Sequence, residues 1–275
     1  MRVGLAACSD PVRSWIDNRL PGFRALLAEH GISLDERILA DQPDASGPTS
    51  GWRVPPQRRA RLVHDLFIDD SIDVIADVSG GNLANEVLDF LDFELIGAHP
   101  KPYVGFSDNS VVCLALYEHA GLRPVLWHAD RVLTRGVGDL IAIANGQRTQ
   151  PQLISDSTLL SAGSPDYPSV ILGGNIRCTA KLAGTRYWPT VPDGAWIILE
   201  GMSISLPAAA TYLTQLRHAG LFANADALIL GQFTAIDKSN ARADLVTVAH
   251  EITELPIWHA PEVGHSQNCA PVTLG

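Results

Sequence analysis

A serine at position 107 lies in the stretch Gly105-Phe-Ser-Asp-Asn, between a short apolar run and an apolar-periodic segment. The pattern predicts a strand that turns into a helix, which would expose the serine beside the N–H groups of a helix start. A nucleophile would suit this position, and so would an ordinary helix-capping serine. Gly105 matches the first glycine of a G-x-S-x-G nucleophile elbow, but Asn109 replaces the second. The stretch alone leaves both interpretations open.

Four other positions could contribute to the same chemistry. The backbone N–H groups of Gly80 and Gly81, after another apolar run, could bind an oxyanion, although two glycines also suit a plain turn. Glu200 ends the apolar run "AWIILE", and His265 follows a glycine in "EVGHSQN". A nucleophilic serine needs a base and a group that orients the base. A solvated strand-end glutamate and a structural histidine would look the same in the sequence.

The first half of the chain alternates strand-like and helix-like segments. Strands are predicted at 2–8, 72–78, 102–106 and 123–129. Helices are predicted at 11–31, interrupted at Pro21-Gly22, and at 55–71, 83–96 and 109–122. This alternation is typical of an α/β fold with a parallel sheet covered by helices on both faces. Ligands bind beyond the carboxyl ends of such strands, where both Ser107 and Gly81 would lie.

The composition changes between residues 136 and 167, which are rich in Gly, Ser, Gln and Pro. We therefore expect an N-terminal α/β domain at 1–135, a junction at 136–167 and a smaller C-terminal α/β domain at 168–275. The second domain has strand-like pieces at 169–175, 195–201 and 226–233, and a helical pattern at 206–223.

The composition restricts the class of protein. The chain has 275 residues, of which 46% are hydrophobic, and can bury a sizeable core. A net charge of -10, with no basic cluster beyond residues 55–62, argues against nucleic acid as a partner. The four cysteines form no CxxC pair, which disfavours zinc and fits a reducing compartment. No apolar run resembles a signal peptide or membrane span, so we expect a cytoplasmic protein without a membrane partner.

Four motifs in order resemble the LD-carboxypeptidase family of serine peptidases, which includes muramoyltetrapeptide carboxypeptidases and microcin-immunity peptidases. "PKPYVGFSDNS" (100–110) resembles the family's serine signature, and the segment 79–101 before it is nearest to the microcin-immunity branch. Residues 171–201 resemble the stretch that leads to the family's glutamate, and residues 256–275 resemble its histidine-containing ending.

The resemblance implies a flavodoxin-like or amidotransferase-like N-terminal domain, a smaller C-terminal domain and an active site between them, commonly in a homodimer. It implies that Ser107 is the nucleophile, His265 the general base and Glu200 the residue that orients the histidine. The backbone N–H groups of Gly81 and Asp108 would form the oxyanion hole. Neither a metal nor a cofactor is implied.

The implied reaction is hydrolysis of an amide bond in an LD-linked murein tetrapeptide or in a peptidyl or aminoacyl nucleotide. Several departures leave the substrate open: Asn109-Ser110 replaces Ile/Val-Thr, Gly201 replaces a second acidic residue, and residues 126–130 lack the family's Gly-Pro. The resemblance also implies a C-terminal tail beyond residue 275. With only three lysines, an arginine is the better candidate to bind a substrate carboxylate.

Two other questions stay open at this point. Trp127 and Trp188 could stack on a nucleobase, although tryptophan more often lies in a core. The alternative function is that of a non-catalytic small-molecule-binding protein on the same scaffold, with Ser107 as a helix cap.

Overall fold

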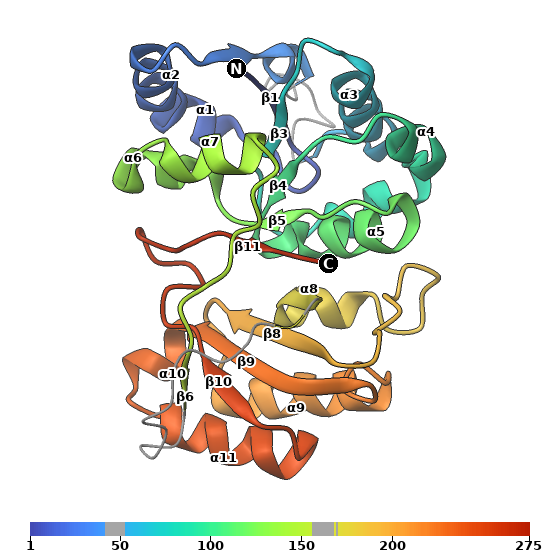
Figure 1. Cartoon of the computed structure of the whole chain (residues 1–275), viewed down its shortest axis with the longest axis vertical. Coiled ribbons are helices and arrows are strands. Elements are labelled where there is room, and N and C mark those ends of the chain that lie inside the picture. Colours follow the sequence, from blue (N-terminus) through green and yellow to red (C-terminus); the bar gives the residue numbers. More distant parts are fainter. Residues whose placement is uncertain (42–52, 156–167, 169) are drawn as a thin grey trace.

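A computed structural model describes residues 1–41, 53–155, 168 and 170–275 of the chain. Figure 1 shows two layered α/β parts stacked along the long axis of the molecule. The first part is built on a six-stranded sheet and the second on a five-stranded sheet. The α/β class predicted from the sequence is confirmed.

The first sheet has the strand order β11-β5-β4-β3-β1-β2. Its strands are β1 (Arg2–Ala6), β2 (Ser33–Asp35), β3 (Val74–Asp77), β4 (Tyr103–Gly105), β5 (Val125–Leu126) and β11 (Val272–Thr273). The four strands predicted here are β1, β3, β4 and β5, and neighbouring members pair in parallel. Ser107 and Gly81 therefore follow the carboxyl ends of adjacent strands, as expected.

Helices cover both faces of the first sheet. They are α1 (Arg13–Asn18), α2 (Leu20–Glu29), α3 (Pro56–Ile68), α4 (Phe93–Ala98), α5 (Ser110–Ala120), α6 (Val132–Arg135) and α7 (Gly138–Ala144). Figure 1 shows α1, α2 and α7 on one side of the strands and α3, α4 and α5 on the other.

Two of the predicted helices differ from the structure. The break within 11–31 falls at Arg19, because Pro21 occupies the first turn of α2, where its missing N–H costs nothing. The segment predicted as one helix at 83–96 is a 3₁₀ helix (Ala84–Phe90) followed by α4. Asp92 interrupts it, because its carboxylate accepts a hydrogen bond from the Leu95 N–H at 2.9 Å and caps the new helix.

The second sheet has the strand order β6-β10-β9-β8-β7. Its strands are β6 (Ile154–Ser155), β7 (Ile171–Asn175), β8 (Ala195–Gly201), β9 (Ala225–Phe233) and β10 (Ile257–His259), and only β6 is antiparallel. The accompanying helices are α8 (Ile176–Lys181), α9 (Leu206–His218), α10 (Thr234–Lys238) and α11 (Arg242–Thr253). The sequence did not predict α11, whose Val, Ile and Thr residues favour strands.

The chain crosses between the two parts and returns. Residues 145–153 lead from α7 to β6, and the segment after β10 returns to the first sheet as β11 (Figure 1). Thr149 N–H donates to Thr273 Oγ1 at 2.9 Å, which joins the two crossing segments. The boundaries at 135 and 168 stay a prediction, while α7 lies inside the expected junction and β11 belongs to the first sheet. In the described ranges, no helix combines the length and apolarity that a membrane span requires.

Candidate active site

Ser107 lies two residues after the end of β4 and begins a 3₁₀ turn (Ser107–Asn109) that continues into α5. Its φ is 56°, a left-handed conformation that L-residues rarely adopt and that is typical of functional turns. Neither helix start has a side-chain cap, so the capping role considered for Ser107 has no hydrogen bond to support it. Glycine is favoured at position 105 by close packing rather than by its backbone conformation, because a Cβ there would lie 3.0 Å from the Cβ of Asn109.

Ser107, His265 and Glu200 lie in one hydrogen-bonded row. His265 Nε2 is 3.1 Å from Ser107 Oγ, and His265 Nδ1 is 2.7 Å from Glu200 Oε2. The carboxylate favours a proton on Nδ1, which leaves Nε2 able to accept the serine hydroxyl proton. Glu200 is 1% exposed, and its other oxygen accepts a hydrogen bond from Asn175 Nδ2 at 2.9 Å. Both oxygens of this buried carboxylate are therefore partnered.

Asn175 and Ser110 connect the two ends of this row, Glu200 and Ser107, so that the hydrogen bonds form a closed ring. The Asn175 N–H donates to Ser110 Oγ at 2.9 Å, and Ser110 Oγ donates to the Ser107 carbonyl at 2.7 Å. Asn175 and Glu200 are neighbours in the β7–β8 register. The ring therefore fixes the backbone of Ser107 to the same two strands that hold the carboxylate.

The loop that carries His265 is held by Gln232 at the end of β9. The Gln232 amide donates to the Pro261 carbonyl at 2.7 Å and to Ser266 Oγ at 3.0 Å, and its oxygen accepts from the Ser266 N–H at 3.0 Å. Gly264 has a φ of 151°, and a Cβ there would lie 2.5 Å from Gln232 Cβ. The loop can therefore pack this closely only with glycine at position 264.

Gly81 and Asp108, whose backbone N–H groups are the expected oxyanion-hole donors, lie in the turns that follow the adjacent strands β3 and β4. Gly81 has a φ of 130°, and a Cβ there would lie 2.2 Å from the Asp10 carboxylate. The Asp108 N–H is in the first turn of its helix, where an N–H has no acceptor within the helix. Asp77 joins the two turns, because one carboxylate oxygen accepts from the Ser79 N–H and from Asn109 Nδ2, both at 2.9 Å.

Two cations on α8 reach across to the same turns. Lys181 Nζ donates to the Asn82 carbonyl at 2.9 Å and forms an ion pair with the Asp108 carboxylate. Arg177 donates to the Gly81 carbonyl at 2.9 Å and to Asn82 Oδ1 at 2.8 Å. We call Arg177 and Lys181 the α8 clamp. It ties the second part of the molecule to both turns next to Ser107.

The Asp108 carboxylate is fully buried, and burial alone would raise its pKa. Hydrogen bonds from Lys181, Ser9 and the Ala84 N–H outweigh this effect, so the pKa lies below its usual value. Asp108 is therefore a charged structural centre directly after Ser107.

His128 lies beside His265 at the carboxyl end of β5. Its ring centroid is 5.8 Å from that of His265 and 4.6 Å from that of Phe106. Burial lowers the pKa of His128 well below its usual value, and the charges of Arg131 and His265 lower it further. A neutral His128 adds no positive charge that would oppose protonation of His265. Its neighbour Trp127 is fully buried, so this tryptophan does not present a face to a nucleobase.

The sequence patterns indicated Ser107 and Gly81, and the family resemblance singled out Glu200 and His265, but neither found the residues that support them. Those supports are Asp77, Asn175, the α8 clamp, Gln232 and His128. Asn175 and the α8 clamp lie in the stretch 171–201 that carried part of the family resemblance, and so could have been found. Asp77, Gln232 and His128 are ordinary polar residues with no local signal. In the described part of the chain, no three His, Cys, Asp or Glu side chains gather as a metal site would require.

A hydroxyl, an imidazole and a carboxylate in one row, beyond the ends of parallel strands, have the chemistry of a hydrolase site. Comparison with known families agrees with this class. The profile of the LD-carboxypeptidase N-terminal domain matches residues 3–128, and that of the LD-carboxypeptidase C-terminal domain matches residues 169–275. The chain belongs to the LD-carboxypeptidase family and is a hydrolase of the carboxypeptidase class.

Curated relatives represent both branches of the expected resemblance. The murein tetrapeptide carboxypeptidase of Pseudomonas aeruginosa is 27% identical over 78% of this chain and 74% of its own length. The microcin C7 self-immunity protein MccF of Escherichia coli is 20% identical over 99% of this chain and 88% of its own length.

A solved structure has the same fold over the whole chain. The muramoyltetrapeptide carboxypeptidase of Oxalobacter formigenes superposes with a TM-score of 0.81 at 18% identity, covering 100% of this chain and 93% of that one. The predicted family is confirmed.

Proposed function

We propose that the chain is a serine peptidase in which Ser107 attacks an amide carbonyl of a small substrate. The observation that carries this proposal is the row from the Ser107 hydroxyl through the His265 imidazole to the buried Glu200 carboxylate. The contact between Ser107 and His265 is within the reach that proton transfer requires, and the contact between His265 and Glu200 is a short hydrogen bond that orients the imidazole. The left-handed conformation of Ser107 supports the same role.

In the proposed mechanism, His265 Nε2 takes the hydroxyl proton as Ser107 Oγ bonds to the carbonyl carbon. Glu200 holds Nδ1 and stabilises the imidazolium that forms. The N–H groups of Gly81 and Asp108 bind the oxyanion of the tetrahedral intermediate. His265 then gives its proton to the leaving nitrogen, and an acyl-enzyme remains on Ser107. Water, activated by His265, hydrolyses the acyl-enzyme and releases the second product.

Two substrate classes follow from the family: an LD-linked murein tetrapeptide, and a peptidyl or aminoacyl nucleotide. The relatives include examples of both classes. One is named a murein tetrapeptide carboxypeptidase, and a solved MccF structure contains glutamyl sulfamoyl guanosine. A second MccF structure contains aspartyl sulfamoyl adenosine. We propose a homodimer in the cytoplasm that uses neither metal nor cofactor and binds neither nucleic acid nor membrane.

A fluorophosphonate probe tests the nucleophile. Covalent labelling that mass spectrometry locates at Ser107, and that is lost in Ser107→Ala, would support the peptidase. Ser33→Ala, at an exposed serine on β2, is the matched control, because it removes a hydroxyl that takes no part in the hydrogen bonds around Ser107. Tight ligand binding without labelling would instead favour the non-catalytic binding protein.

A hydrolysis screen of LD-tetrapeptides against aminoacyl sulfamoyl-adenosines, read by mass spectrometry, decides between the substrate classes. Each substrate is compared with its LL- or D-aminoacyl diastereomer as a matched control. Ser107→Ala must abolish any turnover that is assigned to this site.

A further inference from the structure

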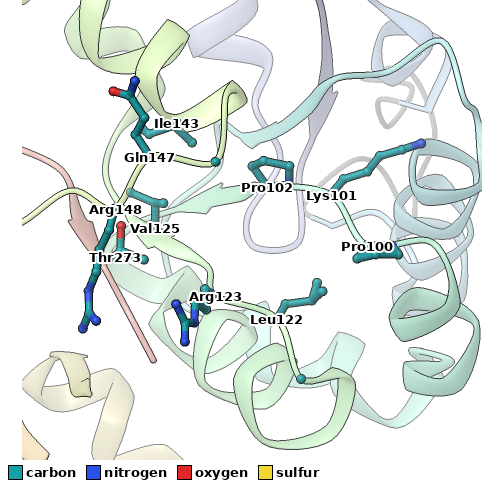
Figure 2. Close-up of a pocket in the computed structure, with 12 residues that line it drawn as sticks. Pro100, Lys101, Pro102, Leu122, Arg123, Val125, Ile143, Gln147, Arg148 and Thr273 are labelled. Atoms are coloured by element: carbon teal, nitrogen blue, oxygen red, sulfur yellow. The ribbon is translucent and has the colours of Figure 1, made fainter. Parts of the chain in front are cut away.

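A cavity lies beside the segments that lead into β4 and β5 (Figure 2). Most of its lining residues precede β4 and β5 or follow α7, whereas Ser107 lies beyond the carboxyl end of β4. Its volume is about 310 Å³, at the lower end of the range of small-molecule sites. The cavity is therefore separate from the candidate active site, and the peptidase mechanism makes no use of it.

The walls of this cavity are largely apolar. They are formed by Pro100, Pro102, Leu122, Val125 and Ile143. Thr273 lines it too, but its hydroxyl is engaged with the N–H and hydroxyl of Thr149, both at 2.9 Å. An apolar wall of this kind suits an aliphatic or aromatic group.

Two arginines stand at the rim. Figure 2 shows the side chains of Arg123 and Arg148, both of which line the cavity, extending in the same direction. Among the residues that the structure describes, no carboxylate lies within 4.0 Å of either group. Arg148 makes one long hydrogen bond, to the Pro168 carbonyl at 3.4 Å. Lys101 adds nothing here, because its ammonium points away and donates to the Asp69 carbonyl.

This pairing of like charges is unfavourable in the free protein. Burial lowers the pKa of Arg148, and the nearby charge of Arg123 lowers it further. Several other arginines of this acidic chain have carboxylate partners, as in the bidentate pair of Arg24 with Glu36. An oxyanion between Arg123 and Arg148 would relieve their repulsion and accept hydrogen bonds from both.

We propose that this cavity binds a small amphipathic anion, whose carboxylate or phosphate head contacts Arg123 and Arg148 and whose apolar body fills the cavity. The proposal is independent of the peptidase function, since none of the lining residues belongs to the candidate active site. Head and body must act together, because the arginines supply charge and the prolines and aliphatic side chains supply only apolar contact.

Calorimetric titration of the full chain with phenyl phosphate and with hexanoate tests this inference. Inorganic phosphate and acetate serve as heads without a body. We expect saturable one-to-one binding of at least one amphipathic probe, about tenfold or more tighter than its head alone. Comparing phenyl phosphate with inorganic phosphate, and hexanoate with acetate, measures what the apolar body adds to each head.

Variants locate the site. The double substitution Arg123→Gln/Arg148→Gln should weaken binding at least about tenfold, while Arg61→Gln, at an exposed arginine on α3, should leave it unchanged. Ser107→Ala should bind the probe like the wild type, which separates this result from the fate of the peptidase proposal. Circular dichroism checks that each variant is folded. The inference is wrong if neither probe binds at millimolar concentration, if the folded double variant binds equally well, or if the heads alone bind as tightly.

Discussion

His265 Nε2 lies 3.1 Å from Ser107 Oγ, although 158 residues separate the two in the sequence. The serine follows a strand of the first sheet, and the histidine lies on the segment that returns from the second sheet. Proton transfer between them would therefore depend on how the two parts of the molecule are held together.

Substitutions in the row should have graded, non-additive effects on turnover. Once a hydrolysed substrate is known, Ser107→Ala and His265→Ala should each lower kcat by about 10,000-fold or more, because either change disables the whole unit. Glu200→Gln should cost less, since it keeps the shape but loses the charge that stabilises the imidazolium. Steady-state kinetics of single and double variants measures this. If Ser107→Ala turns the substrate over at the wild-type rate, the serine-peptidase proposal fails.

The α8 clamp should support catalysis through the turns it holds. Lys181→Met should lower kcat by about 10- to 100-fold with little change in KM, because small displacements of oxyanion donors are costly. It should also weaken inhibition by a peptide boronate, whose tetrahedral adduct needs the same donors. Lys181→Arg should restore part of both effects. Lys238→Met, at an exposed lysine, is the control and should behave like the wild type.

Lys181→Met should also lower the stability of the fold, since the buried Asp108 carboxylate would lose its cationic partner. We expect Lys181→Met to lower the free energy of unfolding by about 3 kcal/mol in urea denaturation. The double variant Lys181→Met/Asp108→Asn should recover much of this loss, because it removes the unpaired charge. If the losses in free energy of unfolding caused by the two substitutions simply add in the double variant, the ion pair is not the source of the effect.

Gln232 should matter for turnover although its side-chain hydrogen bonds go to Pro261 and Ser266 rather than to the three residues in the row. Gln232→Ala removes the hydrogen bonds to Pro261 and Ser266 that hold the histidine loop. We expect kcat and the rate of fluorophosphonate labelling to fall together by about 10- to 100-fold, because His265 would sample unproductive positions. Gln215→Ala, on the exposed face of α9, provides the comparison. Unchanged labelling in Gln232→Ala would mean that other contacts position the loop.

His128 should make stability depend on pH in the weakly acidic range. Its pKa is lowered in the folded protein, so the unfolded chain binds a proton that the folded chain does not. This effect leaves the free energy of unfolding unchanged above the unfolded pKa of about 6.5. As pH falls below that value, it lowers the free energy of unfolding by up to about 1.4 kcal/mol per pH unit. His128→Gln should therefore flatten the fall in stability between about pH 6.5 and pH 5. His250→Gln, an exposed histidine on α11, should not. Equal slopes in wild type and His128→Gln would contradict this account.

The sequence by itself determined the alternation of strands and helices in the first half, because hydrophobic periodicity is a local property. It also placed Ser107 and Gly81 at the ends of adjacent strands, since a parallel βαβ order puts those ends at one edge. Glu200 and His265 had no local signal of their own and were singled out through the family resemblance. The break at Asp92 was missed because a capping aspartate inside an amphipathic pattern looks like any polar residue.

Only the tertiary structure decided how the site is held. The Asn175 N–H meets Ser110 across 65 residues, and Lys181 meets Asp108 across 73, so neither contact leaves a periodicity in the sequence. The neutral state favoured for His128 likewise follows from burial among residues brought together by folding. Hydrophobic pattern determines which segments become strands and helices. The partner of a buried polar group is determined by which segments the packed core brings within hydrogen-bond distance.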